Sequence, residues 1–73
     1  MSTFQPTFSR VWDGAQLKYW RQVKGMNQTE LAGKIGVTRN TLSGWERGMR
    51  PTPFRVQQLA DALGCSFQVL SGS

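Results

Sequence analysis

Three side chains in one short segment of this chain have the chemistry to recognise nucleic-acid bases. Residues 36–48 read GVTRNTLSGWERG, in which Arg39 and Asn40 are adjacent and Ser43 follows three residues later. An arginine can pair in a bidentate manner with guanine, and an asparagine can do so with adenine. This chemistry is useful only if the segment is a helix that turns these side chains toward a partner.

The apolar residues of the segment predict such a helix. Thr38 is a favourable N-cap, and Leu42 and Trp45 are three residues apart, which places them on one face. If that face is buried, the three polar side chains lie on the outer side, with Gly44 beside them. Gly44 costs a helix about 1 kcal/mol relative to alanine, yet the cap and the apolar spacing still favour a helix over about residues 38–47.

A first helix is predicted well before this segment. Asp13 and Gln16 have the spacing of a capping box, so a helix should begin at Gly14 and run to about Lys24, with Gly25 as its stop. Its expected buried residues, at the spacing i, i+3 and i+6, are Leu17, Trp20 and Val23.

A second helix directly precedes the segment. Asn27 and Glu30 repeat the capping-box spacing, and Gly36 is the expected end of the helix. Two helices that cross need a small residue at their closest approach, a turn that tolerates glycine, and apolar residues on their facing sides. Ala32 is the small residue and Gly36 the turn. The facing apolar residues are Leu31, Ile35, Val37, Leu42 and Trp45.

Two more helices are predicted after the segment. Thr52 is an N-cap with Pro53 at the first helical position, and Gly64 is the stop. Ser66 then caps a last short helix, which carries Phe67, Val69 and Leu70. The fourth helix should bury Val56, Leu59, Ala60 and Leu63. Strand signals are absent, so an all-α domain is predicted.

The composition predicts a polyanionic partner and argues against an enzyme. The 73 residues suffice for one small domain, and 9 lysines and arginines against 4 acidic residues give a net charge of +5. With no histidine and a single Cys65, the chain offers no metal-ligand set, no internal disulfide and no general acid–base pair. We expect no cofactor, and we interpret Cys65 as a small buried thiol.

The pattern over residues 26–48 resembles a known family. MNQTELAGKIGVTRNTLSGWERG, followed by PTPFRVQQLADALGCSFQVL, is similar to the lambda-repressor-like (Cro/repressor, XRE) helix-turn-helix DNA-binding domain. The resemblance covers about residues 13–70 and implies a five-helix all-α domain whose third helix enters the major groove of DNA. It leaves out residues 1–12, an apolar arm that either folds back on the domain or pairs with a second subunit, and residues 71–73, a C-terminal tail.

The resemblance and the side-chain chemistry together indicate candidate contacts with DNA. The residues expected to contact bases are Thr38, Arg39, Asn40 and Ser43. Those expected to contact phosphates are Asn27, Gln28, Thr41, Arg47, Arg50 and Arg55. Members of the family carry a long polar residue at the position of Gly44, which has no side chain to contact a base. Either the recognition site is therefore shorter, or the backbone approaches DNA more closely. The resemblance also implies a partly buried ion pair between Arg21 and Glu46, which would hold the first helix against the third.

These residues favour a transcriptional regulator that binds a specific sequence of double-stranded DNA, as phage repressors, bacterial repressors and Cro-like proteins do. We expect it to bind its operator as a homodimer. They also fit an antitoxin-like module that grips a protein partner through residues 1–12 or the C-terminal helix, or an architectural or recombination-associated DNA binder. No run approaches the length of a membrane span or a signal core. We therefore expect a protein of the bacterial cytoplasm or nucleoid, encoded by a bacterium or by a phage.

Overall fold

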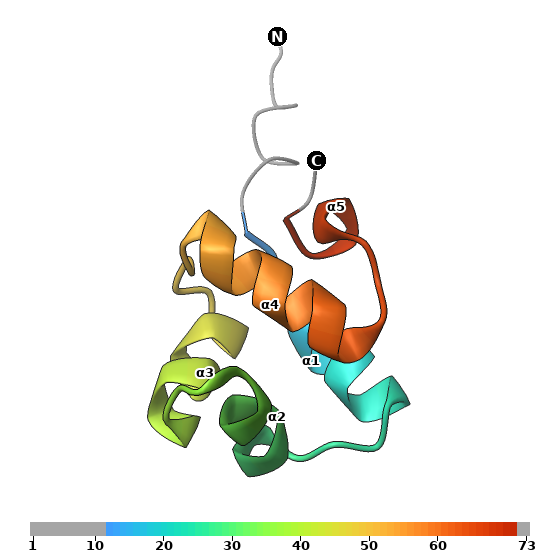
Figure 1. Cartoon of the computed structure of the whole chain (residues 1–73). Coiled ribbons are helices and arrows are strands. Elements are labelled where there is room, and N and C mark those ends of the chain that lie inside the picture. The colour runs from blue at the N-terminus through green and yellow to red at the C-terminus, as the bar shows by residue number, and fades with distance from the viewer. Residues whose placement is uncertain (1–11, 72–73) are drawn as a thin grey trace, which may run out of the picture.

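The computed structural model describes residues 12–71, which form five helices and no strand (Figure 1). The helices are α1 (Gly14–Val23), α2 (Gln28–Ile35), α3 (Arg39–Glu46), α4 (Pro53–Leu63) and α5 (Phe67–Ser71). The predicted all-α class with five helices is therefore confirmed. A helix long and apolar enough to cross a membrane is absent from the described residues.

Capping side chains set most of the helix ends. The Asn27 side chain accepts a hydrogen bond from the Glu30 N–H (2.7 Å), and the Glu30 carboxylate accepts one from the Asn27 N–H (2.9 Å), which completes the predicted capping box. Thr38 and Thr52 cap α3 and α4 through hydroxyl groups that accept a backbone N–H. Gly36 ends α2 with a φ of +78°, a conformation that glycine adopts without a side-chain penalty.

The cap of α1 is simpler than the predicted capping box. The Asp13 side chain accepts the N–H of Ala15 (3.0 Å), and the Gln16 N–H bonds instead to the backbone carbonyl oxygen of Asp13 (3.1 Å). The helix nevertheless begins at Gly14 as expected. At the other end of the chain, Ser66 caps α5 by accepting the Val69 N–H (3.3 Å), in agreement with the prediction.

The prediction that Val23 lies in the core is wrong. Val23 is 54% exposed, and the buried position on this face of α1 belongs to Arg21, which is 9% exposed. A residue four positions after Leu17 stays on the same face of a helix, whereas a residue six positions later turns away from it. Arg21 can occupy this buried position because a carboxylate from α3 pairs with it.

The core lies where the five helices meet. α1 packs against α3 and α5, α2 packs against α3 and α4, and α4 also packs against α5, so the contacts close into a ring. Figure 1 shows α2 and α3 together at one end of the domain and α5 at the other, with α4 between them. The buried apolar residues are Trp12, Leu17, Leu31, Ala32, Ile35, Leu42, Trp45, Val56, Leu59, Ala60, Leu63 and Leu70. All four positions predicted for the inner side of the fourth helix are among them.

Trp12 belongs to the folded domain. Its side chain is buried, and its indole Nε1 donates a hydrogen bond to the backbone carbonyl oxygen of Trp45 (2.7 Å). At this residue the chain folds back on the domain, which is one of the two alternatives that the sequence left open. Residues 1–11 and 72–73 lie outside the described residues. The hypothesis of an antitoxin-like module that binds a protein partner depends largely on residues 1–11.

Gly14 lets α1 approach the end of α3 closely, a feature that the sequence analysis missed. A Cβ on this residue would lie 2.5 Å from the carbonyl oxygen of Trp45 and closer still to that of Glu46. Backbone atoms cannot move aside as the end of a flexible side chain can, and packing this tight leaves no room for an added methyl group. Glycine is therefore required where α1 meets α3.

Candidate nucleic-acid interface

α3 buries one side and presents the other to solvent. Leu42 is fully buried and Trp45 is 8% exposed, whereas Arg39 and Asn40 are exposed in the first turn. Within residues 12–71, the side chains of Arg39 and Asn40 have no hydrogen-bond or ion-pair partner. The predicted orientation of the helix is confirmed, and both side chains are available to a ligand.

The hydroxyl groups of α3 have partners along the helix itself. Oγ1 of Thr38 accepts the Thr41 N–H (3.2 Å) and lies 2.9 Å from Oγ1 of Thr41. The half-buried Ser43 accepts a hydrogen bond from Nη1 of Arg47, one turn later. These hydroxyls, which the sequence assigned to DNA contact, are thus held in position on the outer surface.

The sequence places Gly44 beside the outward polar residues, and the structure adds that Gly44 is buried. The N–H of Met49 donates to the Gly44 carbonyl oxygen (3.0 Å), after a turn at Gly48 with a φ of +118°. The sulfur of Met49 then lies 3.0 Å from the position that a Cβ on Gly44 would take. Because Met49 itself is 67% exposed, its side chain forms the surface of α3 at this point.

A partly buried hydrogen-bond network joins α3 to α1 and α2. The Glu46 carboxylate accepts hydrogen bonds from Nε (2.6 Å) and Nη2 (3.3 Å) of Arg21, and from Nε2 of Gln28 (3.0 Å). Nη1 of Arg21 donates to the carbonyl oxygen of Met26 (2.8 Å). The side chains of Arg21 and Glu46 are 11% and 6% exposed, so the ion pair is largely shielded from water. The network fixes the start of α2 against the end of α3.

Three arginines that the sequence assigned to phosphate contact have different surroundings. Arg47 is the C-cap of α3 and Arg50 follows three residues later, and both are exposed. Arg55 is half-buried, and its Nη1 donates to the carbonyl oxygen of Ile35 (3.1 Å) and to Oε1 of Gln58 (2.7 Å). Arg55 therefore holds the C-terminal end of α2 against α4.

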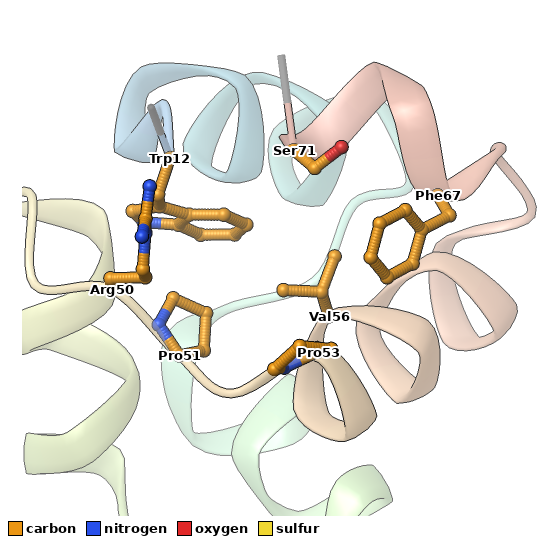
Figure 2. A pocket seen from close by; sticks show the side chains of 7 residues that line it. All are labelled: Trp12, Arg50, Pro51, Pro53, Val56, Phe67 and Ser71. Atoms are coloured by element: carbon orange, nitrogen blue, oxygen red, sulfur yellow. The ribbon is translucent and has the colours of Figure 1, made fainter. Parts of the chain in front are cut away.

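A pocket of about 370 Å³ lies between α4, α5 and the loop of residues 50–53. Its lining residues are Trp12, Arg50, Pro51, Pro53, Val56, Phe67 and Ser71. Figure 2 shows the rings of Trp12, Pro51 and Phe67 around the space, with the guanidinium of Arg50 at its edge. The lining is predominantly apolar and brings no pair of ionisable groups together, so it does not resemble a catalytic site.

All four carboxylates of the chain have structural partners. Asp13 caps α1, Glu30 completes the capping box of α2, and Glu46 pairs with a buried arginine. Asp61 accepts a hydrogen bond from Nε2 of Gln57 (2.9 Å). Within residues 12–71, none of these carboxylates pairs with Arg39 or Arg47, so the positive charge of these two exposed arginines stays at the surface, where it attracts anions.

Cys65 is half-buried rather than fully buried. Burial raises the pKa of its thiol, although a backbone hydrogen bond and the charge of Lys24 oppose this in part. A thiol with a raised pKa is protonated at neutral pH, and only the thiolate is a good nucleophile. This cysteine therefore lacks the features of a catalytic residue.

Comparison with known proteins identifies the family. Residues 17–70 match the family model described as helix-turn-helix. The chain belongs to the helix-turn-helix family. The match also confirms the resemblance to the lambda-repressor-like group that residues 26–48 indicated.

Several relatives resemble this helix-turn-helix protein over most of its length. An uncharacterized HTH-type transcriptional regulator of Sinorhizobium fredii is 39% identical over 54 residues, which cover 73% of this chain and 70% of the relative. The restriction-modification controller protein C.AhdI from Aeromonas hydrophila has a TM-score of 0.74 at 33% identity, over 78% of this chain and 84% of that one. The N-terminal DNA-binding domain of the biofilm regulator SinR from Bacillus subtilis has a TM-score of 0.74 at 30% identity, over 84% and 91%.

The same helix-turn-helix fold also occurs within a longer enzyme. Hydroxypropylphosphonic acid epoxidase from S. wedmorenis matches with a TM-score of 0.74 at 30% identity, over 80% of this chain but 32% of the enzyme. The similarity is thus confined to one part of that protein. Fold alone does not assign function, so the function has to be inferred from the side chains on the surface of α3.

Proposed function

We propose that this protein is a sequence-specific double-stranded DNA-binding transcriptional regulator whose helix α3 enters the major groove. The observation that carries the proposal is the exposure of Arg39 and Asn40 on a helix anchored by Leu42 and Trp45. The N-terminal residues of a recognition helix reach the base edges, and arginine and asparagine are the side chains that pair with guanine and adenine.

The proposed contacts with the DNA backbone lie on α3 and around its C-terminal end. Gln28 opens α2, where backbone N–H groups and the positive end of the helix suit a phosphate, and its bond to Glu46 holds it beside α3. Thr41 is exposed on α3, and Arg47 and Arg50 are exposed beyond its C-terminal end. Contacts of this kind position a protein on the duplex without reading its sequence.

Four other candidate residues make hydrogen bonds within the domain, and these bonds change the proposed role of two of them. The side-chain oxygen and the backbone N–H of Asn27 form the capping box, and Arg55 bonds to the end of α2, so we assign both residues to holding α2 in place. Thr38 and Ser43 stay in the proposed base-contacting set. The Ser43 hydroxyl takes part in one hydrogen bond within the domain and the Thr38 hydroxyl in two, so each keeps some hydrogen-bonding capacity toward a base.

We propose further that the protein binds as a homodimer of the repressor or Cro-like kind. Two copies of α3, related by a two-fold axis, would read half-sites about one helical turn, or roughly 34 Å, apart. A single exposed helix face this short reads only a few base pairs, so a dimer supplies the site length that specificity needs. A bound dimer that covers promoter DNA would block transcription.

We propose no catalytic activity for this chain. Its four carboxylates cap helices, pair with an arginine or accept an amide hydrogen bond. It has no histidine, and burial raises the pKa of its one thiol, that of Cys65. A reaction would need a positioned acid, base or nucleophile, and these residues supply none.

Selection of bound sequences from a random pool of DNA duplexes tests the proposal. We expect the protein to enrich one palindromic motif whose half-sites are centred about 10 base pairs apart. The control is the double variant Arg39→Ala/Asn40→Ala, which should keep its melting temperature because both side chains are exposed, yet enrich no motif. Failure of the unmodified protein to enrich a motif at low salt, or the same motif from the double variant, would refute the proposal.

A further inference from the structure

Met49 lies where the outer side of α3 lacks a side chain. Asn40 and Gly44 are four residues apart, so they lie one above the other on the same face of the helix. Gly44 has no side chain to extend from this face. The sulfur of Met49 sits over it, 3.0 Å from the position that a Cβ would take.

The backbone holds Met49 in this place. The Gly48 N–H donates to the carbonyl oxygen of Trp45 (3.2 Å), and the Met49 N–H donates to that of Gly44 (3.0 Å). Gly48 has a φ of +118°, in a region that other residues rarely adopt. The chain therefore turns back along α3 immediately after the helix ends. The two hydrogen bonds fix the backbone of Met49, although its side chain is exposed.

We propose that Met49 contacts DNA bases in place of Gly44, through an apolar contact between its side chain and the C5 methyl group of a thymine. The inference rests on the proposed function, which directs this side of α3 into the major groove. Apolar side chains recognise the thymine methyl group there, and a flexible, unbranched methionine can adapt its shape to it. Arg39 and Asn40 would then read polar base edges, and Met49 would read an apolar one.

The position of the thymine follows from the geometry. Asn40 and Gly44 are four residues apart, or about 6 Å along the helix axis, and base pairs are stacked about 3.4 Å apart. The thymine should therefore lie about one or two base pairs from the base that Asn40 contacts.

Exposure alone does not single out Met49. Tyr19, Val23, Phe54 and Val69 are also exposed apolar residues, and scattered residues of this kind need no functional explanation. These four belong to other helices, whereas Met49 covers the outer side of α3 at Gly44, in the C-terminal half of the helix. This location, rather than its exposure, distinguishes it.

The experiment compares the unmodified protein with Met49→Ala, Met49→Leu and the control Val23→Ala, which also shortens an exposed apolar side chain. Each is used in duplex selection well below its melting temperature, so that only folded protein is tested. The motif of the unmodified protein should contain a thymine at the inferred position. Met49→Ala should weaken the preference for thymine at this position about fourfold, because about one methyl group is no longer buried. The base preferences at the other positions of the motif should not change. Met49→Leu and Val23→Ala should keep the full motif.

Replacing that thymine by deoxyuridine, which lacks the methyl group, gives a second readout. The unmodified protein should lose about fourfold in affinity, whereas Met49→Ala should bind both duplexes equally. Identical motifs for the unmodified protein and Met49→Ala, or equal losses at all positions, would overturn the role of Met49 while leaving the proposed function intact. Failure of the unmodified protein to enrich any motif would overturn the proposed function itself.

Discussion

Glu46 accepts hydrogen bonds from Arg21 of α1 and Gln28 of α2, although its own side chain is only 6% exposed. Glu46→Gln would leave the buried guanidinium of Arg21 without its counter-charge. Breaking a buried pair on one side is strongly destabilising, so we expect the free energy of unfolding to fall by about 3 kcal/mol. Urea denaturation of the variant and the unmodified protein measures this change.

Glu30→Gln is the matched control for this substitution. Glu30 is exposed, and a glutamine can also complete a capping box, so its replacement should change the free energy of unfolding by less than about 0.5 kcal/mol. A change as small as this in Glu46→Gln would show that the pair is not shielded from water.

Single residues were predictable from the sequence where local spacing decides their environment. Leu42 and Trp45 are buried as their spacing on one face indicates, and Arg39 stays outside. Burial of Arg21 instead of Val23 depends on a carboxylate that comes from another helix. Helical spacing alone cannot show such a partner, and the resemblance to a known family was needed to suggest it.

Helix ends were predictable because their causes are local. Asn27, Thr38 and Thr52 cap the helices that follow them, and Gly36 and Gly64 end the preceding ones with positive φ angles. Such signals span only a few residues of sequence. The cover that Met49 places over α3 and the close approach of α1 to α3 depend on how elements meet, so the sequence did not reveal them.

Gly14→Ala tests the close approach of α1 to α3. The added Cβ would collide with the backbone carbonyl oxygens of Trp45 and Glu46, so the helices must move apart. We expect the free energy of unfolding to fall by about 1–3 kcal/mol, as for other over-packed sites. Thermal denaturation followed by circular dichroism measures the loss.

Gly33→Ala is the control for that experiment. Gly33 is an exposed glycine within α2, and a Cβ there would meet nothing within 4 Å. Alanine is the better helix former, so this variant should be more stable than the unmodified protein by up to about 1 kcal/mol. Equal stability of Gly14→Ala and the unmodified protein would contradict the close packing of α1 on α3.

At the scale of the whole molecule, we infer that the positive charge of the protein and the packing of its helices both contribute to the proposed DNA-binding surface around α3. The net charge of +5 was evident from the sequence, and the structure adds that the carboxylates have partners within the domain. Arg39 lies at the start of α3, and Arg47 and Arg50 lie beyond its end. We infer that one surface of the protein contacts both the bases and the phosphate backbone of DNA.

The affinities of Arg39→Ala and Arg47→Ala for the selected operator and for a random duplex, measured over a range of salt concentrations, test this division of roles most directly. Arg39→Ala should lose about 1–3 kcal/mol on the operator and little on random DNA, with relaxed preference at one base position. Arg47→Ala should lose affinity for both duplexes alike and reduce the salt slope by about one. Equal losses on the two duplexes for both variants would contradict the account.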